Sequence, residues 1–253
     1  MSAPRTVVLV HGAWHGAWCF AALQDALDRR GVPSLAVDLP GHGASTAPLG
    51  DLFTDARHVA DLLAVLADRR PGDPPVLVGH SYGGAVITEA AAHTAVHHLV
   101  YLAAFALDEG ESVGSFMRAA PAADVLLDRC VTPAPDVDGR PSSTVLRPDE
   151  QTVRALYGRC DPAIGAAALA RLSPQPVDTM RGRVSGAPRD TVPSTYVVCS
   201  DDLAVAPAHQ RLMAQRCTHT VELDADHSPF LSAVDATADI IGAIATALPA
   251  SGA

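Results

Sequence analysis

Short runs rich in apolar residues recur along the chain, at residues 6–10, 33–37, 76–78, 97–104, 194–199 and 219–223. Runs of this length that are almost continuously apolar are typical of strands buried on both faces of a parallel sheet. Between the runs, apolar residues recur at helical spacing, most clearly over residues 52–66. This alternation of strands and amphipathic helices predicts an α/β fold, with a mostly parallel central sheet flanked by helices.

The regular alternation stops between residues 108 and 191. Prolines separate short helical stretches there, such as residues 150–157 and 162–172. An irregular insertion of this length after a strand is typical of a lid over a binding site. Because the chain has 253 residues, 48% of them hydrophobic, it is long enough for one large core. We predict a core of residues 1–107 and 191–253 with an inserted helical lid of residues 108–190.

The charge balance narrows the range of partners. With a formal net charge of −10, the chain lacks the concentrated basic surface that nucleic acids and anionic membranes require. No apolar run approaches the roughly 20 residues of a membrane helix, and residues 1–5 are too short and polar for a signal peptide. Five cysteines without metal-binding spacing favour reduced thiols. We expect a cytoplasmic monomer or homodimer with no metal, no cofactor, no nucleic-acid partner and no membrane partner.

Residues 79–83 read Gly-His-Ser-Tyr-Gly and lie between an apolar run and a helix of small residues. In this strand–turn–helix setting, Gly-x-Ser-x-Gly forces the serine into a strained turn that exposes its hydroxyl, and flanking glycines avoid a Cβ collision. The adjoining helix N-terminus favours the negative charge that develops during acyl transfer. Ser81 is therefore the predicted nucleophile.

A serine nucleophile needs an imidazole to accept its proton and a carboxylate to orient that imidazole. Asp202 and His227 each follow a predicted strand, at the sheet edge where active sites of open α/β sheets lie. The chain order of Ser81, Asp202 and His227 is the order found in α/β-hydrolases. Asp201, which adjoins Asp202, and Asp108, which follows another predicted strand, are alternative acids.

The stretch at residues 11–18 reads His-Gly-Ala-Trp-His-Gly-Ala-Trp and contains both tryptophans of the chain. It joins the first predicted strand to a helix. Backbone N–H groups in such a turn can point into a shared cavity and form an oxyanion hole. The alternative is a packing loop with a buried aromatic side chain.

Three segments resemble one family of enzymes, namely residues 8–18, 78–84 and 226–230. They are similar to segments of small lidded α/β-hydrolases related to plant methylesterases and hydroxynitrile lyases, and to bacterial esterase relatives. The resemblance spans residues 5–248, although the lid matches only in length and position. It implies the α/β-hydrolase fold, Asp202 as the acid, and an oxyanion hole formed by the backbone N–H groups of Ala13 and Tyr82.

Two positions favour the esterase branch of that family. Hydroxynitrile lyases have a threonine where this chain has Gly12 and a lysine where it has Ser228, so the cation that stabilises departing cyanide is missing. The resemblance therefore implies a serine hydrolase that cleaves a small-molecule carboxylic ester. One alternative is a biosynthetic tailoring enzyme (thioesterase, cyclase or carbon–carbon lyase) with the same three residues, and another is a ligand-binding receptor with residual hydrolase activity.

The predicted substrate pocket combines residues of the first loop with apolar residues in and before the lid. Its candidate lining residues are Gly12, Trp14, His15, Phe105, Phe116, Met117 and Tyr157. Because aromatic residues make up only 4% of the chain, the sequence does not indicate recognition of a large ring system by stacking.

Overall fold

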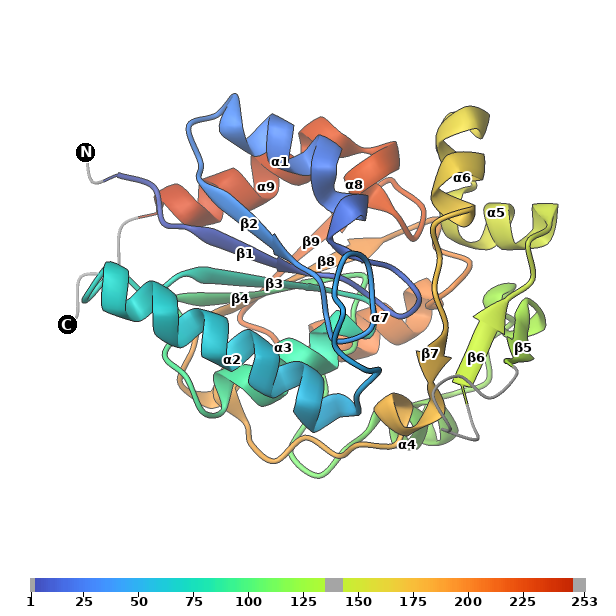
Figure 1. Ribbon diagram of the computed structural model, residues 1–253, viewed down its shortest axis with the longest axis horizontal. Helices are drawn as coiled ribbons and strands as arrows, with labels where there is room; N and C mark the ends of the chain where they lie inside the picture. Colours follow the sequence, from blue (N-terminus) through green and yellow to red (C-terminus); the bar gives the residue numbers. More distant parts are fainter. Residues whose placement is uncertain (1–2, 135–142, 248–253) are drawn as a thin grey trace.

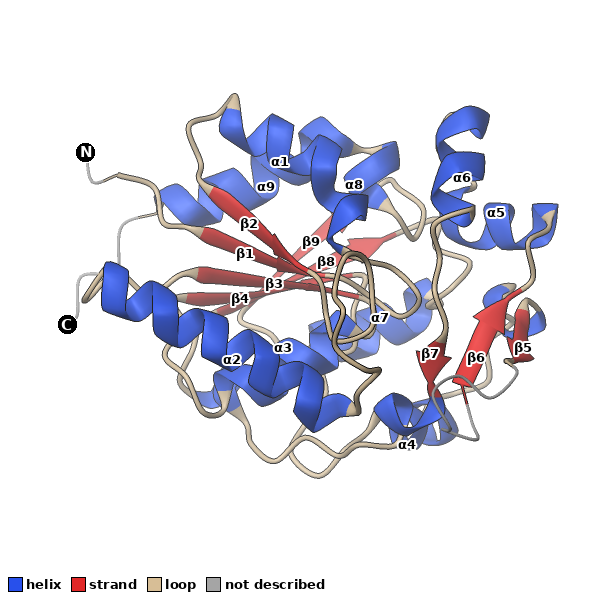
Figure 2. Ribbon diagram, in the orientation of Figure 1, coloured by secondary structure: helices blue, strands red, loops and turns tan. Residues whose placement is uncertain are grey.

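A parallel sheet with helices on both faces forms the core of the protein (Figure 1, Figure 2). The computed structural model describes residues 3–134 and 143–247. Within them, a six-stranded sheet has the order β2-β1-β3-β4-β8-β9, and all neighbouring strands are parallel. The strands are β1 (Val7–Val10), β2 (Ser34–Val37), β3 (Val76–His80), β4 (His98–Leu102), β8 (Ser194–Cys199) and β9 (His219–Leu223). The predicted α/β-hydrolase fold with a mostly parallel central sheet is confirmed.

The helices cover the two faces of the sheet with separate apolar clusters. Helices α1 (Ala21–Asp28) and α9 (Val234–Thr246) pack on one face (Figure 1). The opposite face carries α2 (Leu52–Arg69), α3 (Gly83–Ala91) and α7 (Pro207–Ala214). The predicted last helix is divided into α8 (Pro229–Ser232) and α9, and its predicted end at Leu248 lies outside the described residues.

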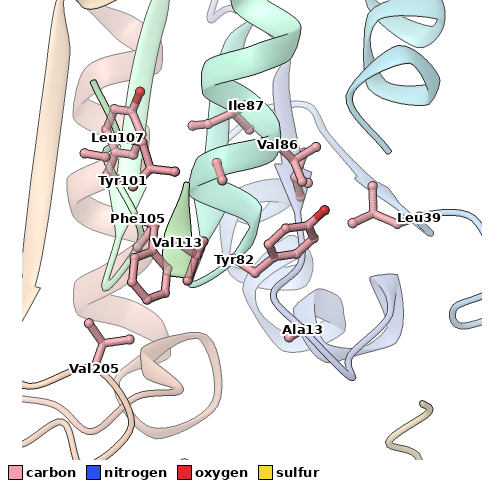
Figure 3. Packing of buried hydrophobic residues seen from close by; sticks show 14 of the residues in the cluster. Ala13, Leu39, Tyr82, Val86, Ile87, Tyr101, Phe105, Leu107, Val113 and Val205 are labelled. Carbon is pink, nitrogen blue, oxygen red and sulfur yellow. The ribbon is translucent and has the colours of Figure 1, made fainter. Parts of the chain in front are cut away.

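Helix α3 is buried along its whole length. It begins directly after β3 and is built largely from glycine, alanine and valine, whose small side chains let the helix lie close to the sheet. Tyr82, Val86 and Ile87 point from this segment into the apolar cluster between α3 and its neighbours (Figure 3). The start of α3 is therefore held firmly against the carboxyl ends of the strands.

The insertion between β4 and β8 lies beyond the carboxyl ends of the strands (Figure 1). Its helices are α4 (Val113–Ala119), α5 (Glu150–Tyr157) and α6 (Pro162–Leu169), with short 3₁₀ turns η2 (Leu127–Arg129), η3 (Val177–Met180) and η4 (Pro188–Asp190). Helix α5 matches the predicted stretch 150–157, and α6 ends three residues before the predicted end at residue 172. We keep residues 108–190 as the proposed bounds of the lid.

The insertion that we propose as a lid is not purely helical, which corrects one detail of the prediction. Strands β5 (Val131–Pro133), β6 (Ser143–Leu146) and β7 (Gln175–Pro176) form a three-stranded antiparallel sheet in the order β5-β6-β7. Each strand is too short to show an alternating pattern, and β7 pairs with β6 although about thirty residues of chain separate them.

No helix within residues 3–134 and 143–247 has both the length and the apolar character needed to cross a membrane.

Candidate active site

Ser81 lies in a tight turn between β3 and α3, at the carboxyl end of the sheet. Its φ of +53° is in the left-handed region, which is strained for a residue with a side chain. The Ser81 N–H donates to the Leu102 carbonyl (3.3 Å), and the Ser81 carbonyl accepts from the Phe105 N–H (3.0 Å). A Cβ at Gly79 would lie 2.5 Å from the Gly83 carbonyl oxygen, so glycine lets the helix start directly against the strand.

His227 and Asp202 form a buried pair at the same edge of the sheet. The His227 Nδ1–H donates to Asp202 Oδ2 over 2.7 Å, and each residue is 2% exposed. Asp202 Oδ1 accepts the N–H groups of Ala204 (2.7 Å) and Val205 (2.9 Å), and Gln210 Nε2 donates to Oδ2 (2.7 Å). Because these three donors hold the carboxylate in place as an acceptor for His227 Nδ1–H, His227 Nε2 is the ring nitrogen left to act as a base.

The two alternative acids lie elsewhere. Asp201 is exposed, and Asp108 pairs with Arg189 (2.7 Å) and Arg216 (3.3 Å). Of the three candidate carboxylates, all within the described residues, Asp202 alone contacts His227.

His80 connects the nucleophile turn to the histidine loop, a role that the sequence did not suggest. Its Nε2–H donates to the His227 carbonyl over 2.8 Å, and the two rings are 4.6 Å apart. Burial lowers the pKa of His80 well below its ordinary value, and the nearby His227 ring lowers it further, so His80 is neutral. In the described part of the chain no direct hydrogen bond joins the Ser81 hydroxyl to His227; this bond is often long before substrate binds.

Two backbone N–H groups beside Ser81 have no protein acceptor among the described residues, namely those of Ala13 and Tyr82. Both residues line the same cavity as Ser81. Position 12 adjoins them, and a Cβ on Gly12 would lie 2.8 Å from the Ser81 Cβ and 3.0 Å from His80 Nδ1. The close approach of the two loops therefore requires a residue without a side chain at position 12.

Ser81 opens into a cavity of about 260 Å³ whose wall is largely apolar. Phe105, Val113 and Val205 line it, and all three belong to the buried apolar cluster drawn in Figure 3. The wall is formed by Ala13, Trp14, Ser81, Tyr82, Phe105, Val113, Met117, Leu127, Asp128, Val131, Thr144, Val177, Met180, Ala204 and Val205. Asp128 is the one charged residue among them. A larger hollow of about 570 Å³ lies between β2 and α2, but its wall contains none of Ser81, Asp202 and His227.

The predicted lining residues divide into two groups. Trp14, Phe105 and Met117 lie in the wall of the cavity, whereas the other four lie outside it: Gly12, His15, Phe116 and Tyr157. Gly12 is covered by the nucleophile turn. The Tyr157 hydroxyl donates to His15 Nε2 (2.7 Å), and the Phe116 ring packs against the rings of Phe105 and His209. Residues of η2, β5 and η3 line the cavity instead, and only the folded structure of the insertion shows this.

Metal donors are not grouped in the part of the chain that the structure describes: no three or more His, Cys, Asp or Glu side chains converge on a possible ion site. The five cysteines are all free thiols.

The model of the Alpha/beta hydrolase family matches residues 7–240, which is nearly the whole chain. The chain belongs to the alpha/beta hydrolase family. The resemblance to plant methylesterases and bacterial esterases is thereby confirmed at the level of the family.

Several proteins similar to this hydrolase have esterase or hydrolase names. It is 30% identical to Methylesterase 7 of Arabidopsis thaliana over 239 residues, covering 90% of this chain and 91% of the relative. It is 41% identical to the carbendazim hydrolyzing esterase of a Nocardioides strain over 108 residues, covering 42% and 44%. The crystal structure of a pyrethroid hydrolase from Sphingobium faniae matches with a TM-score of 0.80 at 25% identity, covering 96% and 98%. The protein is therefore an enzyme of the carboxylesterase type.

Proposed function

We propose that this hydrolase cleaves a small carboxylic ester through an acyl-enzyme on Ser81. The observation that carries the proposal is the buried pair of His227 and Asp202, joined over 2.7 Å beside the strained turn of Ser81. A hydroxyl is a weak nucleophile at neutral pH, and an oriented imidazole is the usual means of activating it.

The reaction proceeds in two halves. His227 Nε2 takes the proton of the Ser81 hydroxyl while the serine oxygen attacks the ester carbonyl carbon, and the carbonyl oxygen becomes an oxyanion. The N–H groups of Ala13 and Tyr82 bind that oxyanion. His227 then gives its proton to the departing alkoxide. In the second half, His227 deprotonates a water that attacks the acyl carbon. His227 then returns this proton to the Ser81 oxygen as the bond between that oxygen and the acyl carbon breaks, and the carboxylic acid leaves. Asp202 stays ionised and stabilises the imidazolium.

The size and the apolar wall of the cavity favour the binding of a small substrate that is uncharged or weakly polar. Its volume of about 260 Å³ is slightly below the range of about 300–1,000 Å³ usual for small-molecule sites. Neither lysine nor arginine lines the described cavity, and Asp128 adds a negative charge to its wall. Because the wall has no cationic side chain, an anionic substrate meets no compensating charge. Partial burial raises the pKa of the Asp128 carboxyl, and the nearby Asp124 carboxylate raises it further.

A panel of 4-nitrophenyl esters of increasing acyl length, run beside mandelonitrile, tests the proposal. We expect hydrolysis of the acetate and butyrate, a decline in kcat/KM of at least tenfold by the decanoate, and negligible cyanide release. Ser228 has no charge to stabilise a leaving cyanide, and its buried hydroxyl contacts no hydrogen-bond partner in the described structure. Cleavage of mandelonitrile faster than that of any ester would reverse the assignment and favour a lyase.

The close contact at position 12 gives a second prediction. Gly12→Ala should lower kcat for 4-nitrophenyl acetate at least tenfold, because the new methyl group displaces either Ser81 or the oxyanion loop. Gly242→Ala is the matched control, since its Cβ would lie 3.7 Å from the nearest atom, in ordinary contact. Wild-type activity in Gly12→Ala would contradict the close approach of the two loops.

A further inference from the structure

The lid holds all the polar groups of Trp14. The Trp14 backbone N–H donates to Gln175 Oε1 (3.1 Å), and the Trp14 carbonyl accepts from the Ser173 N–H (2.9 Å). The indole N–H donates to the Thr144 carbonyl (3.2 Å). Thr144, Ser173 and Gln175 belong to the lid, whereas Trp14 belongs to the loop after β1. The two parts of the chain are about 130 to 160 residues apart.

Trp14 needs this support because its backbone is strained. Its φ of +64° lies in the left-handed region, which a bulky aromatic residue seldom adopts. Such a conformation persists only where the surrounding bonds determine it from several sides. Without the lid contacts, the loop would relax to an ordinary conformation.

The peptide group that joins Ala13 to Trp14 is bound at both of its polar atoms. Its N–H is the one that donates to Gln175. Its carbonyl, that of Ala13, accepts from His15 Nδ1 (2.8 Å), and His15 Nε2 accepts from the Tyr157 hydroxyl (2.7 Å). Burial lowers the pKa of His15 to about 4, so the ring is neutral and has the one donor and one acceptor that these bonds require. Tyr157 ends α5 of the lid, so both bonds lead to the lid.

Gln175 is itself fixed in one orientation. It is 1% exposed, and its Nε2 donates to Thr179 Oγ1 (3.0 Å). The Thr144 hydroxyl donates to the Gln175 backbone carbonyl (3.2 Å), and His42 Nε2 lies 3.0 Å from Gln175 Oε1. Because the amide nitrogen faces Thr179, the amide oxygen must face the Trp14 N–H. The side chain is therefore a rigid acceptor beneath the loop.

We propose that the lid forms a structural part of the oxyanion hole, and that Gln175 is a positioning residue that sets the direction of the Ala13 N–H. This role rests on the proposed function, in which that N–H binds the oxyanion. Gln175 does not touch the substrate in this arrangement. It acts through the Ala13–Trp14 peptide, so its loss affects the transition state more than the binding of the ester.

Replacement of Gln175 by an apolar residue of similar size tests the role. Gln175→Leu should lower kcat for 4-nitrophenyl acetate by about 10- to 100-fold while KM stays within threefold, because a small displacement of a donor impairs only the transition state. Affinity for a trifluoromethyl ketone, which forms a tetrahedral adduct with a serine nucleophile, should fall by the same factor. The concentration of active enzyme is measured by titrating Ser81 to completion with a fluorophosphonate, and kcat is calculated from that concentration. Unfolded molecules are thereby left out of kcat.

Two further variants make the result specific. Gln175→Glu keeps an oxygen acceptor for the Trp14 N–H, so its kcat should be at least tenfold higher than that of Gln175→Leu. Gln151→Leu is the matched control, because Gln151 is an exposed glutamine of the same lid whose side chain contacts Arg147 instead; it should behave as wild type.

A kcat for Gln175→Leu within threefold of wild type, a loss confined to KM, or a glutamate variant as impaired as the leucine variant overturns the role of Gln175. In those cases the proposed esterase function stands, because wild type is active. If wild type hydrolyses no ester and Ser81 is not labelled, the proposed function itself fails and this role fails with it.

Discussion

Ser81→Ala should lower kcat for 4-nitrophenyl acetate by about four or more orders of magnitude and leave the fold intact. The residues of a triad act as a unit, so the loss of the nucleophile removes most of the catalysis. The fold should persist because the substitution removes one oxygen atom from a residue whose backbone bonds hold the turn. Steady-state kinetics and covalent labelling by a fluorophosphonate measure the effect.

The control for this variant is Ser45→Ala, which removes a hydroxyl that lies outside the cavity wall. It should be labelled and should turn over as wild type does. Labelling that persists in Ser81→Ala would locate the nucleophile at another serine.

Asp202→Asn is expected to have the second largest effect, about 10⁴-fold in kcat. The asparagine amide would donate to His227 Nδ1 and so leave the ring proton on Nε2, where the base is needed. The Asp202 carboxylate also accepts from Ala204, Val205 and Gln210, so thermal unfolding should be recorded with the kinetics to separate lost stability from lost turnover.

Asp201→Asn and Asp108→Asn are the comparison variants. Asp201 is exposed, and Asp108, also exposed, contacts Arg189 and Arg216 rather than His227. Each variant should keep kcat within threefold of wild type. A loss in Asp201→Asn as large as that in Asp202→Asn would overturn the assignment of the acid.

Local patterns predict the core of this fold well. The strands at residues 194–199 and 219–223 and the helix at residues 150–157 have the predicted bounds, because their apolar spacing and flanking turn residues are local signals. Local signals also indicate where each strand ends, so the sequence names Ser81, Asp202 and His227 as residues that follow strands.

Contacts between distant segments are what the sequence does not reveal. Gln175 reaches Trp14 across 161 residues, and His80 reaches His227 across 147. Neither residue carries a local signal of its partner. The cavity wall also depends on contacts between distant segments, since Leu127 and Val131 of the insertion line the same cavity as Ser81. Tertiary packing therefore decides the residues that surround the predicted nucleophile.

Both tryptophans of the chain, Trp14 and Trp18, lie in the stretch 11–18 beside Ala13. Trp14 is 9% exposed, and the Arg171 guanidinium lies 4.6 Å from the centre of the Trp18 ring system. The intrinsic tryptophan fluorescence of the protein therefore arises entirely from residues 14 and 18, in and directly after the loop that carries the proposed oxyanion donor. The emission maximum and the quenching of this fluorescence depend on the surroundings of the two indole rings, which include Thr144 and Arg171. Fluorescence of the unlabelled protein can therefore be used to follow the active site.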